Sequence, residues 1–372
     1  MTFRKVRVVF LVRDVGPTSM PWNDLYPIAR RISPGTMYPP AVVGFPFKFR
    51  AKISWKQCNE SARKYLLCNP LSVLNYLWRL YRNACSNGEL LIVHIHNPLV
   101  SLVGFVAKLF FPQIKIVANL HTDWSCLLPR HKLGLHLLAT ISNRFISVSE
   151  ASQNSIPFLL RERLKRNGQL VIIHNGIDPK KIGCVNVVRE TTHTETVAIV
   201  VARMVTPKNH SFILQLFAKT PELHKLVWYG DGDLRPNIED EIKRLGIHSR
   251  VELKGRRPRS EVLNGLAKGS IYLSASKWEG IGVANLEASA LGCWPFLSKI
   301  PPHDEIALML GFETYPLNDL EKWRLAIIEY LTKSTSIKMD MREMLVNKTL
   351  SKFDLEKSVS RYLEVYNELI KK

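Results

Sequence analysis

Short runs of apolar residues alternate along the chain with longer stretches in which apolar residues recur every three or four positions. The short runs are rich in Val and Ile and predict strands, whereas the periodic stretches predict helices. This alternation is typical of βαβ units, whose strands form parallel sheets. Predicted strands cover residues 6–12, 90–95, 115–119, 144–148, 170–173, 197–202, 225–229, 250–253, 271–274 and 294–297. Predicted helices cover residues 71–82, 99–111, 150–165, 210–218, 234–245, 259–267, 283–291, 318–332, 336–347 and 354–371.

A polar stretch without periodicity, residues 183–195, separates two such series and indicates a linker. The 372 residues suffice for two domains. The sequence therefore predicts two doubly wound α/β domains facing across a cleft, residues 1–180 and 181–353. The last helix, about 354–372, is expected to pack back on the first domain. Ligands of such sheets bind beyond the carboxyl ends of the strands.

The charge is unbalanced, with 52 Lys and Arg against 32 Asp and Glu, a net +20. Residues 1–200 hold 26 basic and 10 acidic side chains, so most of the excess lies there. A basic half suggests an anionic partner, which charge alone leaves open between nucleic acid, an anionic membrane leaflet and a phosphorylated substrate. A merely soluble basic surface is the alternative.

The apolar runs are short. The first, residues 8–12, is too short for a signal-peptide core. The most apolar stretch, residues 99–111, contains Lys108 and is too short to span a bilayer. We therefore expect a cytoplasmic protein, either free in the cytosol or peripheral on the inner face of the plasma membrane.

The segment after the predicted strand 271–274 combines two glycines with two carboxylates. Glycines at a strand-to-helix turn let a ligand approach the backbone. The helix start offers free N–H groups and a partial positive charge that suit phosphate. Glu279 could take sugar hydroxyls near a reacting carbon, and Glu287 could take two ribose hydroxyls. Alternatively, Glu287 is a surface residue and Glu279 a partner of the helix dipole. The candidate binding residues of this segment are Glu279, Gly280, Ile281, Gly282, Val283 and Glu287.

Two cations follow the predicted strand 197–202. Arg203 comes directly after it, and Lys208 stands five residues later. Cations at a strand end can neutralise a diphosphate, with Arg as a fork and Lys as a point charge. They would also stabilise the charge that grows on a leaving diphosphate. A solvated loop pair is the alternative.

The two aspartates of the turn Gly230-Asp-Gly-Asp233 have the D-x-D spacing of a metal site. It opens a predicted helix, however, and Asp231 and Asp233 fit turn and N-cap chemistry. Six scattered cysteines without C-x-x-C spacing give no zinc site. We therefore expect no metal site. Gly230, in the same glycine turn, is a candidate ligand-binding residue.

Taken together, these motifs resemble glycosyltransferase family 4, whose members are retaining enzymes of the GT-B fold with two Rossmann-like domains. The resemblance covers about residues 144–305. The matching motifs are Ser-Lys-Trp-Glu-Gly-Ile-Gly-Val-Ala-Asn-Leu-Glu-Ala at 276–288, Val-Ser-Glu at 148–150, His-Asn-Gly-Ile-Asp at 174–178, Val-Ala-Arg at 201–203 with Lys208, Tyr-Gly-Asp-Gly-Asp at 229–233 and Leu-Lys-Gly at 253–255.

The resemblance implies a hexosyltransferase that uses a nucleotide sugar and needs no metal. Its proposed route is a front-face displacement assisted by the leaving phosphate, so no general base is assigned. The residues implied to be catalytic are Glu279, His121, Arg203 and Lys208. His121 follows the predicted strand 115–119 and would face the donor sugar. Gly16 and Arg256 are further candidates for donor binding, whereas His94 and His96 are expected to have structural or acceptor-side roles.

The stretch 274–302 is similar to bacterial exopolysaccharide mannosyltransferases, which use GDP-mannose and a polyprenyl-diphosphate oligosaccharide. The resemblance thus implies mannose transfer to a lipid-linked glycan in surface polysaccharide or lipopolysaccharide synthesis, with UDP-sugars as the alternative donors. The basic first half would then meet an anionic membrane surface. Its basic clusters, interleaved with aromatic residues, include Lys52, Lys56, Arg63, Lys64, Arg79, Arg82, Arg130 and Lys132.

Three other classes compete with this prediction. A nucleic-acid-binding protein would explain the net positive charge. The carboxylates Glu279 and Glu287 would repel nucleic acid, however, so we expect no nucleic acid as a partner. A glycoside hydrolase could use Glu279 and Glu287, but Arg203 and Lys208 argue against it. A non-catalytic transferase-like protein is the third alternative.

Overall fold

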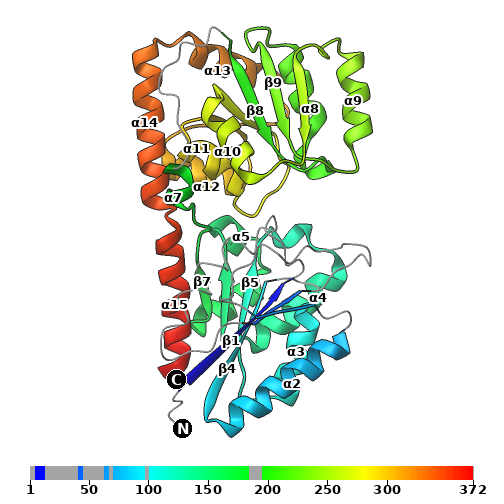
Figure 1. The fold of residues 1–372 in the computed structure, drawn as a ribbon, viewed down its shortest axis with the longest axis vertical. Coiled ribbons are helices and arrows are strands. Elements are labelled where there is room, and N and C mark those ends of the chain that lie inside the picture. The colour runs from blue at the N-terminus through cyan, green and yellow to red at the C-terminus, as the bar shows by residue number, and fades with distance from the viewer. Residues whose placement is uncertain are drawn as a thin grey trace. The chain divides into compact units, whose positions relative to one another are not determined.

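The computed structural model describes residues 5–12, 41–44, 63–66, 70–96, 100–183 and 195–371. The chain divides into two compact units (Figure 1). Unit 1 comprises Met1–Asn175 and Glu356–Lys372, and unit 2 comprises Gly176–Leu355. Each is built on a parallel sheet with helices, which confirms the predicted fold class of two doubly wound α/β domains.

Unit 1 contains a sheet with the strand order β3-β2-β1-β4-β5-β6-β7, in which all neighbours are parallel. The chain order reverses between β1 and β4, the kind of switch point at which such sheets bind ligands. Its strands are β1 (Lys5–Val12), β2 (Ala41–Gly44), β3 (Arg63–Leu66), β4 (Glu89–Ile95), β5 (Lys115–Leu120), β6 (Arg144–Ser147) and β7 (Leu170–Ile172). The sequence did not predict β2 and β3.

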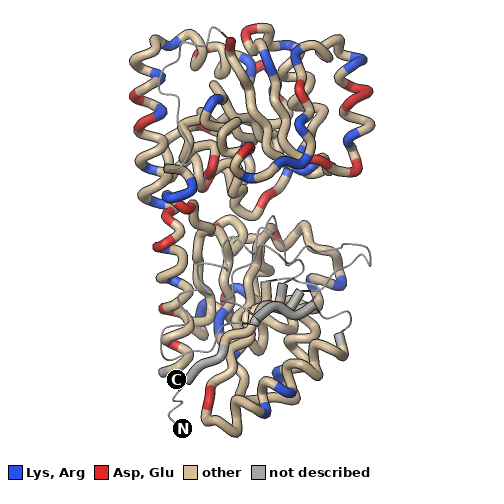
Figure 2. The backbone as a smooth tube through the Cα atoms, in the orientation of Figure 1, with Lys and Arg blue, Asp and Glu red and all other residues tan. Residues whose placement is uncertain are grey.

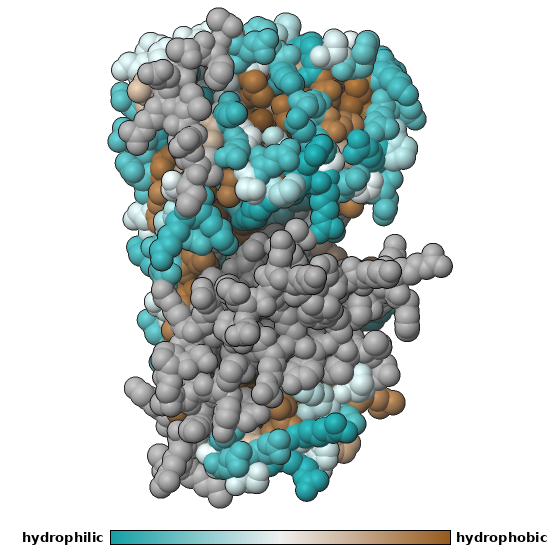
Figure 3. Space-filling view, viewed as in Figure 1, coloured by the Kyte–Doolittle hydropathy of each residue, from teal (hydrophilic) through white to brown (hydrophobic). Residues whose placement is uncertain are grey.

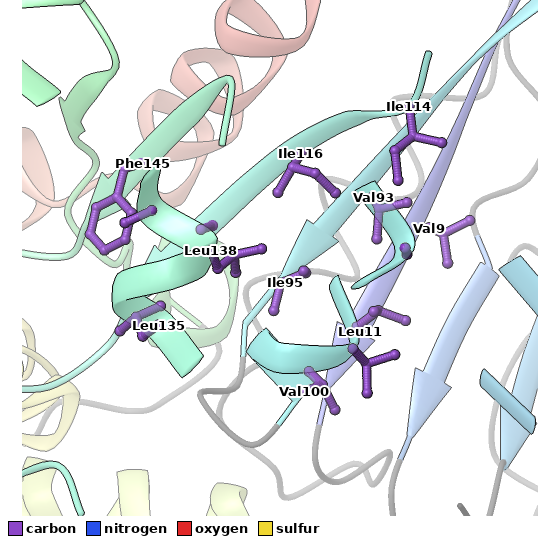
Figure 4. Close-up of a cluster of buried hydrophobic side chains, with 14 of the residues drawn as sticks. Val9, Leu11, Val93, Ile95, Val100, Ile114, Ile116, Leu135, Leu138 and Phe145 are labelled. Carbon is purple, nitrogen blue, oxygen red and sulfur yellow. The ribbon is translucent and has the colours of Figure 1, made fainter. Parts of the chain in front are cut away.

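The central strands of unit 1 are covered on both faces. Every residue of β4 is buried, which is why this strand is an almost continuous apolar run rather than an alternating one. Figure 4 shows one cluster of the core, in which Ile95 from the sheet lies near Leu138 of a covering helix, and Val9 and Val93 are paired on neighbouring strands. The sheet is therefore a rigid platform for the polar residues at its edge.

The helices of unit 1 differ from the prediction at two places. The predicted helix 150–165 is broken into α5 and α6, because Pro157 has no N–H to donate and α6 begins directly after it. Helix α4 was not predicted; it has a proline in its first turn, where the missing N–H costs nothing. The helices are α2 (Pro70–Ser86), α3 (Ser101–Phe110), η3 (Trp124–Cys126), α4 (Pro129–Ile141), α5 (Glu150–Asn154), α6 (Phe158–Arg166) and, in the second segment of the chain, α15 (Leu355–Lys371).

Helix α15 packs its apolar face on unit 1. Its buried residues recur at helical spacing, as expected for one covered stripe. Within unit 1 they are Val359, Tyr362, Val365, Tyr366 and Leu369. The phenol groups of two of these residues reach hydrogen-bond partners at the edge of the sheet, as described below.

Unit 2 contains a second parallel sheet, with the order β10-β9-β8-β11-β12-β13 and its reversal between β8 and β11. Its strands are β8 (Val197–Val201), β9 (Lys225–Tyr229), β10 (Val251–Gly255), β11 (Ile271–Ser274), β12 (Trp294–Ser298) and β13 (Thr314–Tyr315). Its helices are α7 (Pro179–Gly183), η4 (Thr206–Lys208), α8 (His210–Ala218), α9 (Arg235–Arg244), α10 (Arg259–Lys268), α11 (Val283–Ala290), α12 (Pro301–Leu310), α13 (Leu320–Thr332) and α14 (Thr335–Lys352).

The charges of unit 2 are mixed in sign. Figure 2 shows Asp and Glu alternating with Lys and Arg along its helices, whereas acidic residues are sparse in the described part of unit 1.

Helix α12, which the sequence did not predict, again has proline in its first turn. In the described part of the chain, we find no helix with the length and apolar character needed to cross a bilayer.

Candidate functional site

The reversal point of the unit 2 sheet brings together the loops that follow β8 and β11. The backbone N–H of Lys277 donates to the carbonyl of Pro207 over 2.8 Å, which ties one loop to the other. Arg203 and Lys208 lie in the first loop and Glu279 in the second. Arg203 and Lys208 thus share one edge of the sheet with Glu279, which is more than 70 residues later in the sequence. Ligands of doubly wound sheets bind at this edge.

Lys208 and Glu279 form an ion pair at this edge. Their side chains are only 20% and 15% exposed, and the Ser276 hydroxyl donates to the same carboxylate oxygen over 2.9 Å. Burial by itself raises the pKa of Glu279, but the Lys208 charge, the nearby His303 and the two hydrogen bonds outweigh it and hold the pKa below its ordinary value. Glu279 is therefore a fixed, ionised acceptor at neutral pH.

Arg203 is placed differently from Lys208. Its side chain is exposed, and among the described residues we find no hydrogen bond or ion pair of its guanidinium. The two expected cations thus do not act alike, because Lys208 is engaged with Glu279 while the Arg203 fork faces solvent. A lysine ammonium has three N–H donors, so the bond to Glu279 leaves others for an anion.

The loop after β9 packs directly against the end of β8. Gly230 has φ +135°, and a Cβ atom there would lie 1.9 Å from the carbonyl oxygen of Ala202, so only glycine fits. The Gly230 N–H donates to the carbonyl of Gly255, which places the neighbouring Arg256 at the same edge. These contacts bring the backbones that follow β8, β9 and β10 together.

The two aspartates of this turn have different environments. Asp231 accepts from the backbone N–H of Gly232, as a turn residue does. Asp233 was expected to fit N-cap chemistry, but α9 is capped at Leu234 and no side chain caps it. Among the residues that the structure describes, we find no cluster of three or more His, Cys, Asp or Glu suited to a metal ion.

Helix α11 begins at the loop after β11. Gly282 is its N-cap, with φ +76°. The first N–H groups of a helix have no partner within it, so this end can receive an anion. Glu287, in the second turn of α11, is buried and forms an ion pair with Arg259 of α10. The carboxylate is therefore held in place rather than solvated, and Arg259 is a partner that the sequence did not identify.

The corresponding edge of unit 1 carries histidines. His94 and His96 lie at the end of β4, and His121 follows β5. His96 Nδ1 and His121 Nε2 are hydrogen-bonded over 2.9 Å with their rings stacked. The rings of His94 and His96 have centroids 4.0 Å apart.

Helix α15 fixes the tautomer of His94. Asn119 uses its amide N–H to donate to the Tyr362 hydroxyl, and its Oδ1 accepts from His94 Nε2 over 3.0 Å. His94 Nδ1 then accepts from the Tyr366 hydroxyl over 2.6 Å. Burial lowers the pKa of His94 to about 3 and of His121 to about 4, so both imidazoles are neutral at physiological pH.

Several polar residues of the two edges were not identified from the sequence. For Ser276, which is part of the matching motif, the available signal was its position three residues before Glu279. Arg259, His303 and the bond between His96 and His121 depend on contacts between separate elements, which spacing along the chain does not reveal.

Some predicted residues lie outside the described residues, namely Gly16, Lys52 and Lys56, and the side chains of Arg63 and Lys64 are likewise not described. Among the described residues predicted to be catalytic or to bind the donor, His121 is in unit 1 and the others are in unit 2. The predicted His94, His96, Arg79, Arg82, Arg130 and Lys132 also lie in unit 1.

Comparison with known families gives two matches. The model for glycosyl transferases group 1 matches residues 187–347, and the model for glycosyltransferase family 4 matches residues 59–181. Together they extend over most of both units.

Two curated relatives match part of the chain. One subunit of the human phosphatidylinositol N-acetylglucosaminyltransferase is 31% identical over 175 residues, which are 46% of this chain and 34% of the relative. The GDP-mannose:cellobiosyl-diphosphopolyprenol alpha-mannosyltransferase of Xanthomonas campestris is 23% identical over 137 residues, 37% of this chain and 35% of the relative. The matches therefore span about a third of these relatives' length.

A solved structure resembles nearly the whole chain. Anabaena HepE, crystallised in complex with UDP and glucose, superposes with a TM-score of 0.74 at 17% identity, covering 97% of this chain and 99% of that one. At this identity the likeness shows the fold.

Proposed function

The chain belongs to the glycosyltransferases of group 1 and family 4 with the GT-B fold, and on this premise we propose that it moves a hexose from a nucleotide sugar to a glycan acceptor. The half-buried Lys208–Glu279 pair at the reversal point of the unit 2 sheet is the observation that carries the proposal. A nucleotide sugar needs cations for its diphosphate and a fixed acceptor for its sugar hydroxyls, and this edge offers both.

The donor would be held by the elements that converge there. Arg203 and Lys208 would take the diphosphate together with the backbone of Gly280–Val283 at the start of α11. Glu287, held by Arg259, would accept the two ribose hydroxyls, and Arg256 and Gly230 would line the nucleotide. Glu279 would accept hydroxyl protons of the sugar, in charge-assisted bonds that contribute about 1.5–3 kcal/mol each.

The chemistry would follow from this placement. The bond between the sugar C1 and the phosphate oxygen breaks, and a bond between C1 and an acceptor oxygen forms on the same face. The acceptor proton passes to the leaving phosphate oxygen, and the product keeps the donor's anomeric configuration. The exposed Arg203 fork would stabilise the charge that grows on the leaving diphosphate. We assign the stabilisation of this negative charge to Arg203 and Lys208 rather than to a metal ion.

We propose GDP-mannose as the donor, with a UDP-sugar as the alternative. The name of the Xanthomonas relative supports the first, and the complex of Anabaena HepE with UDP and glucose supports the second. The name of the same Xanthomonas relative supports an acceptor linked to a polyprenyl diphosphate, as made in surface polysaccharide synthesis.

Unit 1 would meet a membrane at the cytoplasmic face. Its neighbouring helices α3 and α4 expose large apolar side chains, among them Leu109, Phe110 and Leu133 at 62–72% exposure. Figure 3 shows apolar atoms at the surface of unit 1 beside hydrophilic ones. Arg82 lies over the half-exposed Trp78, and this pairing of cations with apolar side chains suits an anionic lipid surface.

A thermal-shift panel tests the donor proposal. GDP, UDP, ADP and their common sugars are added to the wild type and to Glu287→Gln, with and without EDTA. A ligand at about 100 times its Kd stabilises the fold by about 2.7 kcal/mol. We expect a shift with one nucleotide class that EDTA leaves intact and the variant loses. Absence of any shift would favour a non-catalytic transferase-like protein, and a shift that EDTA abolishes would contradict the metal-independent route.

A further inference from the structure

A buried histidine lies near the loop that carries Glu279. His303 is in the first turn of α12, directly after β12, and its side chain is fully buried. In the sheet, β12 is the neighbour of β11, so the start of α12 adjoins the loop that carries Glu279. Nothing in the sequence motifs gave this residue a role.

The hydrogen bonds of Ser298 fix the tautomer of His303. Ser298 donates its single hydroxyl proton to the carbonyl of Ser276 over 2.6 Å. Towards His303 Nδ1, at 3.1 Å, the same hydroxyl can therefore only accept, and the Ser298 carbonyl at 2.9 Å also accepts. The proton must be on Nδ1. Burial lowers the pKa of His303 to about 4, so the imidazole is neutral and Nε2 carries a lone pair.

Ser276 connects this arrangement to the proposed sugar acceptor. Its carbonyl accepts from Ser298, and its hydroxyl donates to Glu279 Oε1 over 2.9 Å. The bonds therefore run without interruption from His303 through Ser298 and Ser276 to the carboxylate. Ser276, Ser298 and His303 are fully buried, whereas the Glu279 side chain keeps 15% exposure at the edge of the sheet.

We infer that His303 is a positioning residue for Glu279, acting as an Nδ1–H donor through Ser298 and Ser276. The inference rests on the proposed function, because it gives the carboxylate that would hold the donor sugar its fixed orientation. A fixed Glu279 carboxylate matters because a misplacement of about 1 Å can cost about 100-fold in rate. The Nε2 atom is buried and has no hydrogen-bond partner among the described residues, so the support runs through Nδ1.

Two substitutions separate positioning from general packing. Asparagine can keep an N–H donor near the Nδ1 position, whereas leucine fills space without a donor. We expect His303→Leu to lower kcat about 10- to 100-fold. His303→Asn should restore most of this loss, and His248→Gln, which changes an exposed histidine of unit 2, should match the wild type.

The binding pattern gives the readout that a merely structural role would not produce. The affinity for the nucleoside diphosphate alone should stay within about threefold in His303→Leu, since Arg203 and α11 hold that part, while the extra affinity of the nucleotide sugar is lost. Combining Glu279→Gln with His303→Leu should cost no more than Glu279→Gln by itself. Equal losses in the Leu and Asn variants, or a parallel fall in diphosphate affinity, would overturn the inference.

Hydrogen exchange keeps the inference testable even without activity. If the wild type neither binds nor turns over any nucleotide sugar, the proposed function fails. The amides of residues 274–282 should still exchange faster in His303→Leu than in His303→Asn. Equal exchange in the two variants would contradict the positioning role by itself.

Discussion

The two units share one topology but have different chemistry at corresponding edges. Both sheets are parallel and reverse their strand order once, between β1 and β4 in unit 1 and between β8 and β11 in unit 2. At the reversal of unit 1 lie three imidazoles, of which His96 and His121 are bonded to each other and His94 is bonded to Tyr366 of α15. At the reversal of unit 2 lie an ion pair, glycine turns and an exposed arginine.

The difference separates what topology determines from what side chains determine. Topology fixes where a ligand can sit, because the strand ends and their loops diverge only at the reversal point. Side chains decide which ligand suits each place. A charged edge with free backbone N–H groups suits a diphosphate, whereas neutral imidazoles can donate to or accept from hydroxyl groups without attracting an anion.

The largest effect should come from the carboxylate of unit 2. We expect Glu279→Gln to lower kcat/KM about 100- to 1,000-fold, a loss of about 3–4 kcal/mol of transition-state stabilisation, because the amide cannot replace a charged acceptor. Steady-state kinetics measures it. Glu239→Gln changes an exposed carboxylate of α9 and should leave the rate unchanged. Full activity of Glu279→Gln would remove the distinction between the two edges.

A glycine of unit 2 provides the next largest effect. Gly230→Ala should destabilise unit 2 by about 2–3 kcal/mol, because the new Cβ would collide with the Ala202 carbonyl. Gly246→Ala is the matched control, since Gly246 also has positive φ but meets nothing within 4 Å, and it should cost about 1 kcal/mol. Denaturant unfolding of both variants checks this, and equal costs would contradict the close packing of the turns.

Acid should destabilise both units through their histidines, and unit 2 also through a carboxylate at lower pH. The folded pKa of His94 and His121 is below the ordinary value of 6.5, so the unfolded chain binds protons there first. Stability is therefore full above about pH 6.5 and falls towards pH 4, by on the order of 3 kcal/mol per histidine. His210 and His303 add the same trend in unit 2.

Glu279 adds a second loss confined to unit 2. Its folded pKa is below the ordinary value of 4.5, so the stability that it contributes is present above that pH and disappears as the pH falls through the folded pKa. Hydrogen exchange followed separately for each unit from pH 7 to pH 3 measures both losses. Glu279→Gln should remove the second loss only, and a variant with unchanged acid dependence would contradict the ion pair.

The smallest effect concerns the tyrosine that orients His94. Tyr366→Phe removes the donor to His94 Nδ1 and leaves a buried nitrogen unpaired, so it should destabilise unit 1 by about 1–2 kcal/mol. Unfolding of the variant by denaturant tests this. A variant as stable as the wild type would mean that the imidazoles of unit 1 do not depend on α15.

The sequence predicted the architecture well wherever local patterns determine it. Fully buried strands such as β4 are apolar runs, and α15 repeats its apolar residues at helical spacing. Helices α4 and α12 were missed because their first-turn prolines resemble loop signals. The break at Pro157 was missed because the apolar period continues across it.

The site was predictable in its residues more than in its contacts. Glycines and charges after predicted strands pointed to Arg203, Lys208 and Glu279, since strand ends of one sheet meet at one edge. The pairing of Lys208 with Glu279, and of Glu287 with Arg259, depends on loops that approach each other only in the fold. Periodicity contains no information about such contacts.

Hydrogen exchange of the wild type with and without nucleotide sugar tests the central claim, that the reversal point of unit 2 is the donor site. The account predicts protection of residues 201–210 and 274–290 with the preferred donor, and much weaker protection of these segments in Glu287→Gln. Protection confined to unit 1, or no protection at saturating concentrations of both GDP- and UDP-sugars, would contradict it.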